Sequence, residues 1–236
     1  MIATIRNREL GIFELLSFGW NIFINNLDAI LMIIFLIDLP VSLFSTIAQT
    51  LDYREIPIPI VINILISYTL CLSGMAVIFL AEQYISNEKI QYSKALKKSF
   101  SRLGFGWAAG FKSSWIVLFL LFFFIIPGII YWIKYYFVFH ACILREKGST
   151  SALAYSSSLV KGRLFRSFFT IISLIFIIFL PAILVNICLS YLLPQNSEIL
   201  YTNLVYNVLF EMIFMLAFYF FTVVNTVFFL NLDYRK

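Results

Sequence analysis

The chain has 236 residues, of which 62% are hydrophobic and only 12% are charged, and its net charge is +5. Soluble domains average roughly 25% charged residues, so this composition excludes a water-soluble globular protein. Several apolar runs reach the roughly 20 residues that an α-helix needs to cross a hydrocarbon layer of about 30 Å, and we therefore expect an all-α integral membrane protein.

The N-terminal third predicts one surface helix and two spans. Residues 1–26 place apolar side chains on one side of a helix, which indicates an amphipathic helix at the membrane surface. The first span is expected over residues 27–47. Pro40 lies inside it and should kink or divide the helix, because proline has no backbone N–H. The polar residues 49–59 then form a loop, and the second span covers residues 60–81.

The rest of the chain repeats this order of parts. Residues 86–104 are too charged to enter lipid and predict a second surface helix. The third and fourth spans are expected over residues 105–126 and 129–144, with a turn at Pro127-Gly128 between them. Residues 145–166 supply a third surface helix. The fifth and sixth spans follow over residues 168–193 and 200–230.

The basic residues predict the orientation in the membrane. One side receives nearly every lysine and arginine outside the spans, whereas the other receives Arg54 alone. By the positive-inside rule, both termini are expected in the cytoplasm and the number of spans is even, most simply six. This predicts a multi-pass protein of the bacterial cytoplasmic (inner) membrane.

Residues 1–236 are expected to form a single membrane domain that contains three repeat units, at residues 5–82, 88–146 and 149–232. Each unit would consist of a surface helix and two spans, which predicts a pseudo-threefold arrangement. The first span of each unit has a proline after branched and aromatic residues, and each surface helix has a serine on or near its apolar side. These residues, and two small ones that favour close helix packing, are Pro40, Pro127, Pro181, Ser17, Ser99, Ser156, Gly106 and Gly110.

Two neighbouring motifs resemble a known family. The motif IPGIIYWIKYYFV at residues 126–138 is followed by SALAYSSSLVKGR at residues 151–163. This order resembles the six-helix bacterial inner-membrane proteins grouped as YciC-like, and it is similar to the membrane domain attached to some glycerophosphoryl diester phosphodiesterases. The match is best over residues 94–184. The resemblance implies a helical inner-membrane protein and says more about the fold than about the function.

Four ionisable residues fall at membrane depth: Asp38, Lys134, His140 and Glu211. Such groups cost several kcal/mol in the hydrocarbon unless they are paired or hydrated. We expect Lys134 to pair with Glu211 or Asp38. The group either holds helices together or lines a water-filled path.

No catalytic site, metal site or cofactor is expected. His140 is the only histidine, which leaves no second histidine for a zinc motif or a serine-histidine-aspartate triad. The three cysteines lie in apolar runs without metal-ligand spacing.

Basic residues of the second and third surface helices are expected either to contact anionic lipid head groups or only to set the orientation. They are Lys94, Lys97, Lys98, Arg102, Lys161, Arg163 and Arg166. Together these features predict a non-enzymatic accessory or organising component. Its partners would be membrane lipids and a second membrane protein or another copy of the chain, not nucleic acid. The alternative is a small transporter or channel that uses Asp38, Lys134 and Glu211.

Overall fold

The computed structural model describes residues 5, 6, 8–50, 58–88, 91–192 and 200–235, and these residues form helices without any strand. Within them, six segments are long and apolar enough to cross a membrane: Leu27–Thr46, Ile60–Ile85, Tyr92–Phe123, Ile125–Leu144, Leu164–Leu192 and Tyr206–Asp233. The expected all-α multi-pass membrane fold is confirmed. Arg54, on which the orientation argument partly depends, lies outside the described residues.

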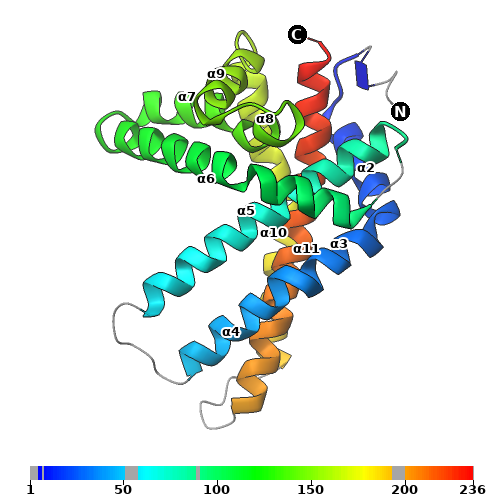
Figure 1. Cartoon of the computed structure of the whole chain (residues 1–236), viewed down its shortest axis with the longest axis vertical. Coiled ribbons are helices and arrows are strands. Elements are labelled where there is room, and N and C mark those ends of the chain that lie inside the picture. The colour runs from blue at the N-terminus through cyan, green and yellow to red at the C-terminus, as the bar shows by residue number, and fades with distance from the viewer. Residues whose placement is uncertain (1–4, 7, 51–57, 89–90, 193–199, 236) are drawn as a thin grey trace.

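The helices follow one another with few long connections (Figure 1). In chain order they are α2 (Ile12–Asn25), α3 (Leu27–Ile33), the π-helix η1 (Ile34–Asp38), α4 (Leu39–Thr50), α5 (Ile58–Ile85), α6 (Tyr92–Phe123), α7 (Ile125–Tyr135), α8 (Val138–Leu144), α9 (Ser149–Leu159), α10 (Leu164–Leu192) and α11 (Leu200–Asp233).

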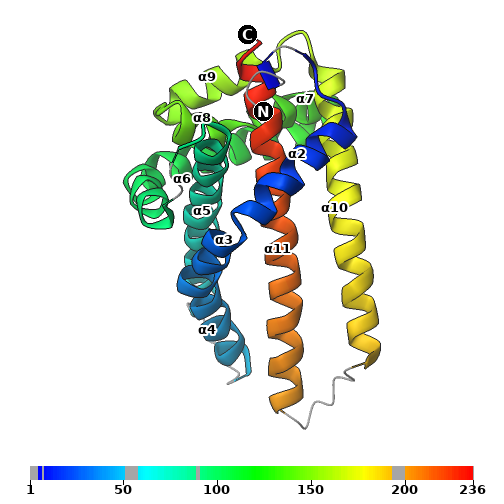
Figure 2. The same cartoon turned by 90° about the vertical axis from the view of Figure 1, so that its right-hand side faces the viewer.

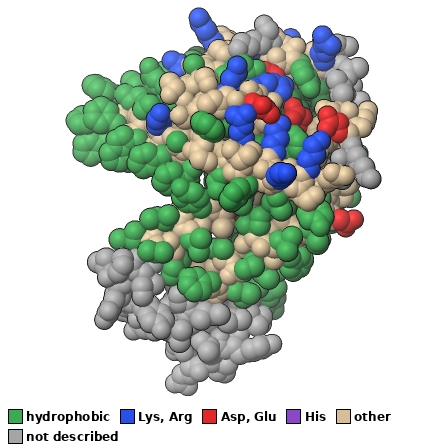
Figure 3. Space-filling view, viewed as in Figure 1, with side chains coloured by type: hydrophobic (Ala, Val, Ile, Leu, Met, Phe, Trp, Pro, Cys, Tyr) green, Lys and Arg blue, Asp and Glu red, His purple; other side chains and the backbone are tan. Residues whose placement is uncertain are grey.

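Helices α4, α5, α10 and α11 extend along the molecule, and α6 to α9 gather at one end of it (Figure 2). The two terminal segments meet at that same end. There the side-chain amide of Asn231 donates to the carbonyls of Ile5, at 2.6 Å, and Arg8, at 2.8 Å. Most of the visible lysine, arginine and acidic side chains also lie there (Figure 3), and we call it the charged end.

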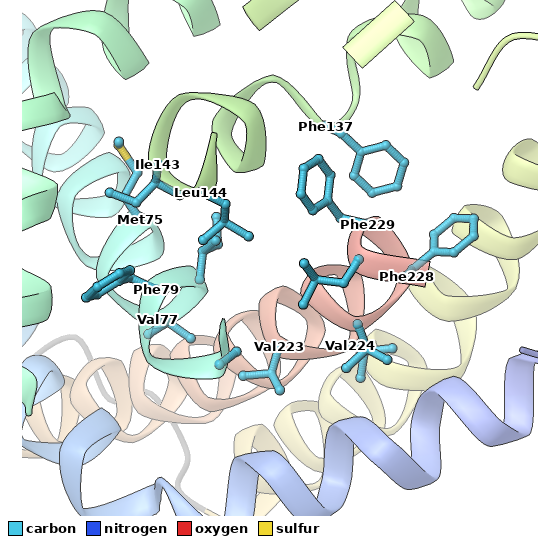
Figure 4. Packing of buried hydrophobic residues seen from close by; sticks show 14 of the residues in the cluster. Met75, Val77, Phe79, Phe137, Ile143, Leu144, Val223, Val224, Phe228 and Phe229 are labelled. Carbon is cyan, nitrogen blue, oxygen red and sulfur yellow. The ribbon is translucent and has the colours of Figure 1, made fainter. Parts of the chain in front are cut away.

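The core is concentrated toward the charged end, where α5 and α11 cross the centre of the molecule. Every residue from 75 to 81 of α5 is buried, as are residues 222–232 of α11. A helix that is apolar and buried all round must be surrounded by others, and here the neighbours include α2, α6, α8 and α10. Figure 4 shows Phe137 beside Phe228 and Phe229 of α11.

Helices α6 and α7 form a hairpin that projects to one side of the bundle (Figure 1). The chain reverses at Phe124, whose backbone is extended (φ −147°, ψ 93°). The turn expected at Pro127-Gly128 is therefore wrong. Pro127 instead occupies the first turn of α7, where its missing N–H breaks no helical hydrogen bond.

The tip of this hairpin is apolar and open. Phe122 is 83% exposed and Ile126 is 73% exposed. Helix α6 also joins the expected second surface helix to the third span without a break, so the boundary near residue 104 is absent. An apolar surface of this kind is stable only in lipid, because in water several hundred Å² of apolar area would be exposed to solvent.

The expected fourth span is bent where α7 ends and α8 begins. Ser156 of α9 bridges this bend: its hydroxyl accepts from the N–H of Phe137 at 3.1 Å and donates to the carbonyl of Lys134 at 2.7 Å. The N–H of Phe137 and the carbonyl of Lys134 thus find hydrogen-bond partners inside the protein where the helix is interrupted. Apolar surroundings require this, because they offer no water as a substitute.

The other two prolines have different effects. The π-helix η1 ends two residues before Pro40 and widens the helix where proline cannot donate and its ring would crowd the preceding turn. Pro181 lies inside α10 without ending it, and its side chain is exposed. The threefold repeat stays a prediction, since the second surface helix is continuous with its span whereas α9 is separated from α10.

Candidate functional site

The π-turn places Asp38 in the interior. Its side chain is 2% exposed, and it faces Tyr219 of α11, whose hydroxyl donates to one carboxylate oxygen. The other carboxylate oxygen has no hydrogen-bond partner among the described residues. A buried carboxyl group with an unused oxygen at a π-turn is an arrangement that recurs at functional sites in helical proteins.

A cavity of about 210 Å³ connects Asp38 with Glu211. Three hydroxyl-bearing residues, Ser42, Ser45 and Thr69, also line it, and no lysine, arginine or histidine is among its described lining residues. Glu211 is half-buried, and one of its carboxylate oxygens has no partner in the part of the chain that the structure describes. The cavity therefore brings two carboxyl groups together with hydroxyls.

Lys134 is not part of this group, and the ion pair expected with Glu211 or Asp38 is absent from the described structure. Its ammonium lies 4.6 Å from the ring centroid of Tyr131, one turn back on α7. The reason is that α7 leaves the bundle as one leg of the hairpin, whereas α4, α5 and α11 enclose the carboxyl groups.

His140 lies apart from the Asp38–Glu211 cavity and from Lys134. It lies on α8, 6% exposed, between the rings of Phe137 and Phe229 at centroid distances of 5.6 Å and 5.3 Å. Neither ring nitrogen has a hydrogen-bond partner among the described residues. The four residues grouped by depth in the sequence thus occupy three different places.

Three of the seven basic residues expected at lipid head groups form ion pairs within the protein. Lys98 and Arg102 both contact the carboxylate of Glu146, at 3.4 Å and 3.0 Å. Arg166 pairs with Glu9 and also donates to the carbonyl of Leu10 at 3.0 Å. These contacts join α6 to the segment before α9, and α10 to the N-terminal segment.

The other four basic residues have no ion pair within the described structure. Lys94, Lys97 and Lys161 are exposed, and Arg163 is half-buried. Two strongly exposed aromatic side chains lie next to them in the chain: Phe100 is 72% exposed and Phe165 is 83% exposed. An aromatic ring beside unpaired lysine and arginine is typical of the membrane–water interface.

An ionic network that the sequence did not reveal holds the charged end together. The guanidinium of Arg145 donates to Asp233 at 2.8 Å and to Glu82 at 3.1 Å, and the hydroxyl of Tyr155 also donates to Asp233. Burial by itself would lower the pKa of Arg145, but the hydrogen bonds and charges of these acids raise it. Arg145 thus joins α5 to α11, and Asp233 joins α11 to α9.

Gly106 and Gly110 both lie at close helix contacts. A Cβ atom on Gly106 would lie 2.7 Å from the sulfur of Met75, and one on Gly110 would lie 2.7 Å from the ring of Phe139. Helix α6 therefore packs closely on α5 and α8 at these positions.

The serines expected at helix contacts also differ. Ser156 bridges the α7–α8 bend and Ser99 is fully buried, but Ser17 is exposed on α2 and is not a packing residue. An apolar face on a surface helix does not specify which of its residues meets a neighbour.

Comparison of the chain with models of protein families, with curated proteins and with solved structures gave no match. The assignment of function therefore depends on the geometry described above.

Proposed function

We propose that this chain is a non-enzymatic, multi-pass protein of the bacterial cytoplasmic membrane that organises anionic lipid, or a partner membrane protein or second copy bound with that lipid, at the cytoplasmic face. The observation that carries the proposal is the division of the seven basic residues. Three form internal ion pairs, and four have no acid partner among the described residues and lie near the exposed Phe100 or Phe165 in the chain.

The orientation in this proposal places the charged end in the cytoplasm, together with both termini. Lysine and arginine concentrate at that end, which favours the cytoplasmic side. The resemblance of residues 126–163 to YciC-like inner-membrane proteins supports the same compartment.

The expected strength of binding to anionic lipid is modest. Each basic residue near an anionic surface contributes about 1 kcal/mol, so four residues contribute about 4 kcal/mol, or close to a thousandfold in affinity. Because the side chains are exposed, this attraction should weaken as ionic strength rises.

A pair of charge-matched variants tests the proposal. Lys94→Gln with Lys97→Gln removes two unpaired charges. Lys112→Gln with Lys147→Gln removes two charges that contact Ser149 and Thr150 or the ring of Tyr155.

The protein is purified from nanodiscs that contain phosphatidylglycerol and phosphatidylcholine, and the lipids retained are measured by native mass spectrometry. We expect the first variant to lose retained phosphatidylglycerol by at least tenfold and the second to resemble the unchanged protein. Equal retention in both variants would refute lipid recognition by Lys94 and Lys97.

The Asp38–Glu211 cavity favours a second candidate, a small proton or cation transporter or channel. Two carboxyl groups and three hydroxyl-bearing residues, with no lysine, arginine or histidine among the described lining residues, suit a proton or a small cation. Lys134, included in this role on sequence grounds, lies elsewhere.

Proteoliposomes that contain the protein, and in parallel Asp38→Asn or Glu211→Gln, would show whether proton or sodium flux depends on these groups. Glu88→Gln, at an exposed position, is the control. Flux that is absent, or that the two variants leave unchanged, would remove this candidate.

A further inference from the structure

The return leg of the α6–α7 hairpin is too short to bring the chain back across a membrane. Helix α7 has 11 residues and is about 16 Å long, whereas a hydrocarbon layer is about 30 Å thick. The carbonyl of Lys134, near the end of α7, accepts from Ser156 of α9 at 2.7 Å. The adjacent Tyr155 donates to Asp233, the last residue of α11. The tip of the hairpin, where α6 ends and α7 begins, therefore lies within about 16 Å of the charged end.

The outgoing leg of the hairpin also stays at the level of the charged end. Arg102 and Lys112 are about 15 Å apart along α6, and both reach the segment that leads into α9. Arg102 contacts the carboxylate of Glu146 at 3.0 Å, and the ammonium of Lys112 lies 3.4 Å from the hydroxyl of Ser149. Figure 1 shows α6 lying across the molecule, whereas α11 runs along it. Helix α6 thus does not descend beside the long helices.

The exposure of the tip identifies what surrounds it. Every residue from 121 to 126 is exposed, and each is a leucine, a phenylalanine or an isoleucine. Consecutive residues point in different directions around a helix, so the tip is bare on all its sides. A docked protein would cover one face and leave the others in water. A medium that covers every side is a solvent, and the solvent that accepts these side chains is hydrocarbon.

The charges along the hairpin set its depth. Lys94 and Lys97 at the start of α6 are exposed at the charged end, and no charged residue follows between Lys112 and Lys134. The start of α6 therefore lies at the head groups and its tip lies among acyl chains. One leaflet contributes about 15 Å of the hydrocarbon layer. A tip within about 16 Å of the charged end reaches no farther than the middle of the bilayer.

We propose that the α6–α7 hairpin is a wedge that enters only the leaflet at the charged end, where acyl chains surround its tip. The hairpin does not cross the membrane. The four other long apolar segments of the described chain then make the crossings: Leu27–Thr46, Ile60–Ile85, Leu164–Leu192 and Tyr206–Asp233. A wedge expands one leaflet alone, so the protein favours membranes that are convex on that side. The orientation proposed above only names this leaflet as the cytoplasmic one, and the insertion does not depend on recognition of anionic lipid.

Spin labels at matched positions on α6 and α10 test the depth of the hairpin. The variants are Phe100→Cys and Phe122→Cys on α6, and Phe169→Cys and Tyr191→Cys on α10, each in a chain whose three native cysteines are changed to alanine. The two positions of each pair are about 33 Å apart along their helix, and all four side chains are exposed, so the changes open no cavity. Electron paramagnetic resonance in phosphatidylcholine liposomes measures access of oxygen, which concentrates in hydrocarbon, and of a water-soluble nickel chelate.

The labels near the two ends of α10 provide the pattern of a crossing helix. We expect the nickel chelate to reach the labels at Phe100 and Tyr191, and only oxygen to reach the label at Phe122. If the hairpin crossed the membrane, Phe122 would lie near the opposite surface and the chelate would reach it as it reaches Tyr191. That result would overturn the proposal. Exclusion of both reagents from Phe122 would show that protein covers the tip, and it would overturn the proposal as well.

The preference for curvature is measured in membrane tubes pulled from giant vesicles. Ser151→Cys, at an exposed position of the charged end, is labelled from outside with an impermeant dye in the same cysteine-free chain. We expect enrichment in the tube over the vesicle. Phe122→Gln with Ile126→Gln makes the tip polar and should abolish this enrichment. Phe169→Gln with Phe176→Gln changes two exposed residues of α10 and should preserve it. Equal density of the parent protein in tube and vesicle, or equal loss in both double variants, would overturn the wedge.

Discussion

Replacement of Asp233 by asparagine should weaken the charged end more than any change at an exposed ion pair. The Asp233 side chain is 7% exposed and that of Arg145 is 25% exposed. Removing one partner of a buried ion pair costs about 3–5 kcal/mol. Arg145 keeps Glu82 at 3.1 Å and some contact with water, so we expect about 2–3 kcal/mol for Asp233→Asn.

The measurement is unfolding of the purified protein in detergent micelles by heat or by added dodecyl sulfate, followed by circular dichroism. Glu14→Gln is the matched control, because Arg8 and Glu14 form an ion pair whose side chains are 60% and 36% exposed. Such a surface pair contributes at most about 1 kcal/mol.

A double-mutant cycle with Arg145→Gln completes the test. If the ionic network joins α5, α9 and α11 as described, the two changes together should cost at least about 1 kcal/mol less than the sum of their separate costs. Strict additivity, or an Asp233→Asn variant as stable as Glu14→Gln, would refute the reasoning.

Three other predictions follow from single contacts. Gly19→Leu should destabilise the protein by about 1–3 kcal/mol, because even a Cβ atom there would overlap the side chain of Val224 on α11. Ser156→Ala should cost about 1–3 kcal/mol, because it leaves the buried N–H at the α7–α8 bend unpaired. Burial and the neighbouring Asp233 raise the pKa of Tyr155 above its ordinary 10.0. The stability that the protonated tyrosine contributes is therefore complete below pH 10 and is lost as the pH rises through the raised pKa. Tyr155→Phe should remove this part of the alkaline instability.

All three are measured as shifts in the same micellar unfolding transition, and two have matched controls. Gly11→Leu places a side chain in a position where the nearest atom to its Cβ is 3.9 Å away. Ser151→Ala removes an exposed hydroxyl that bonds only to the carbonyl of Gly148. A control as destabilised as its test variant would show that the named contact is not the cause.

The sequence by itself was enough to establish the helical membrane fold and where most spans lie. The cost of exposing apolar side chains to water, and of leaving backbone groups unpaired in lipid, depends on local composition and length. For this reason residues 60–81 and 168–193 could be recognised as spans without any knowledge of their neighbours. Pro40 likewise predicted a local distortion of the helix, because the missing N–H is a property of the proline ring itself and does not depend on its neighbours.

Only the tertiary structure decided which side chains meet. Depth in the membrane can be counted along the chain, but position around the bundle cannot, so Asp38, Lys134, His140 and Glu211 looked like one group. The pairing of Arg145 with Glu82 and Asp233 joins residues 63 and 88 positions apart. The same holds for the cavity that connects Asp38 with Glu211, whose walls come from helices that are distant in the chain and meet only once the bundle is packed.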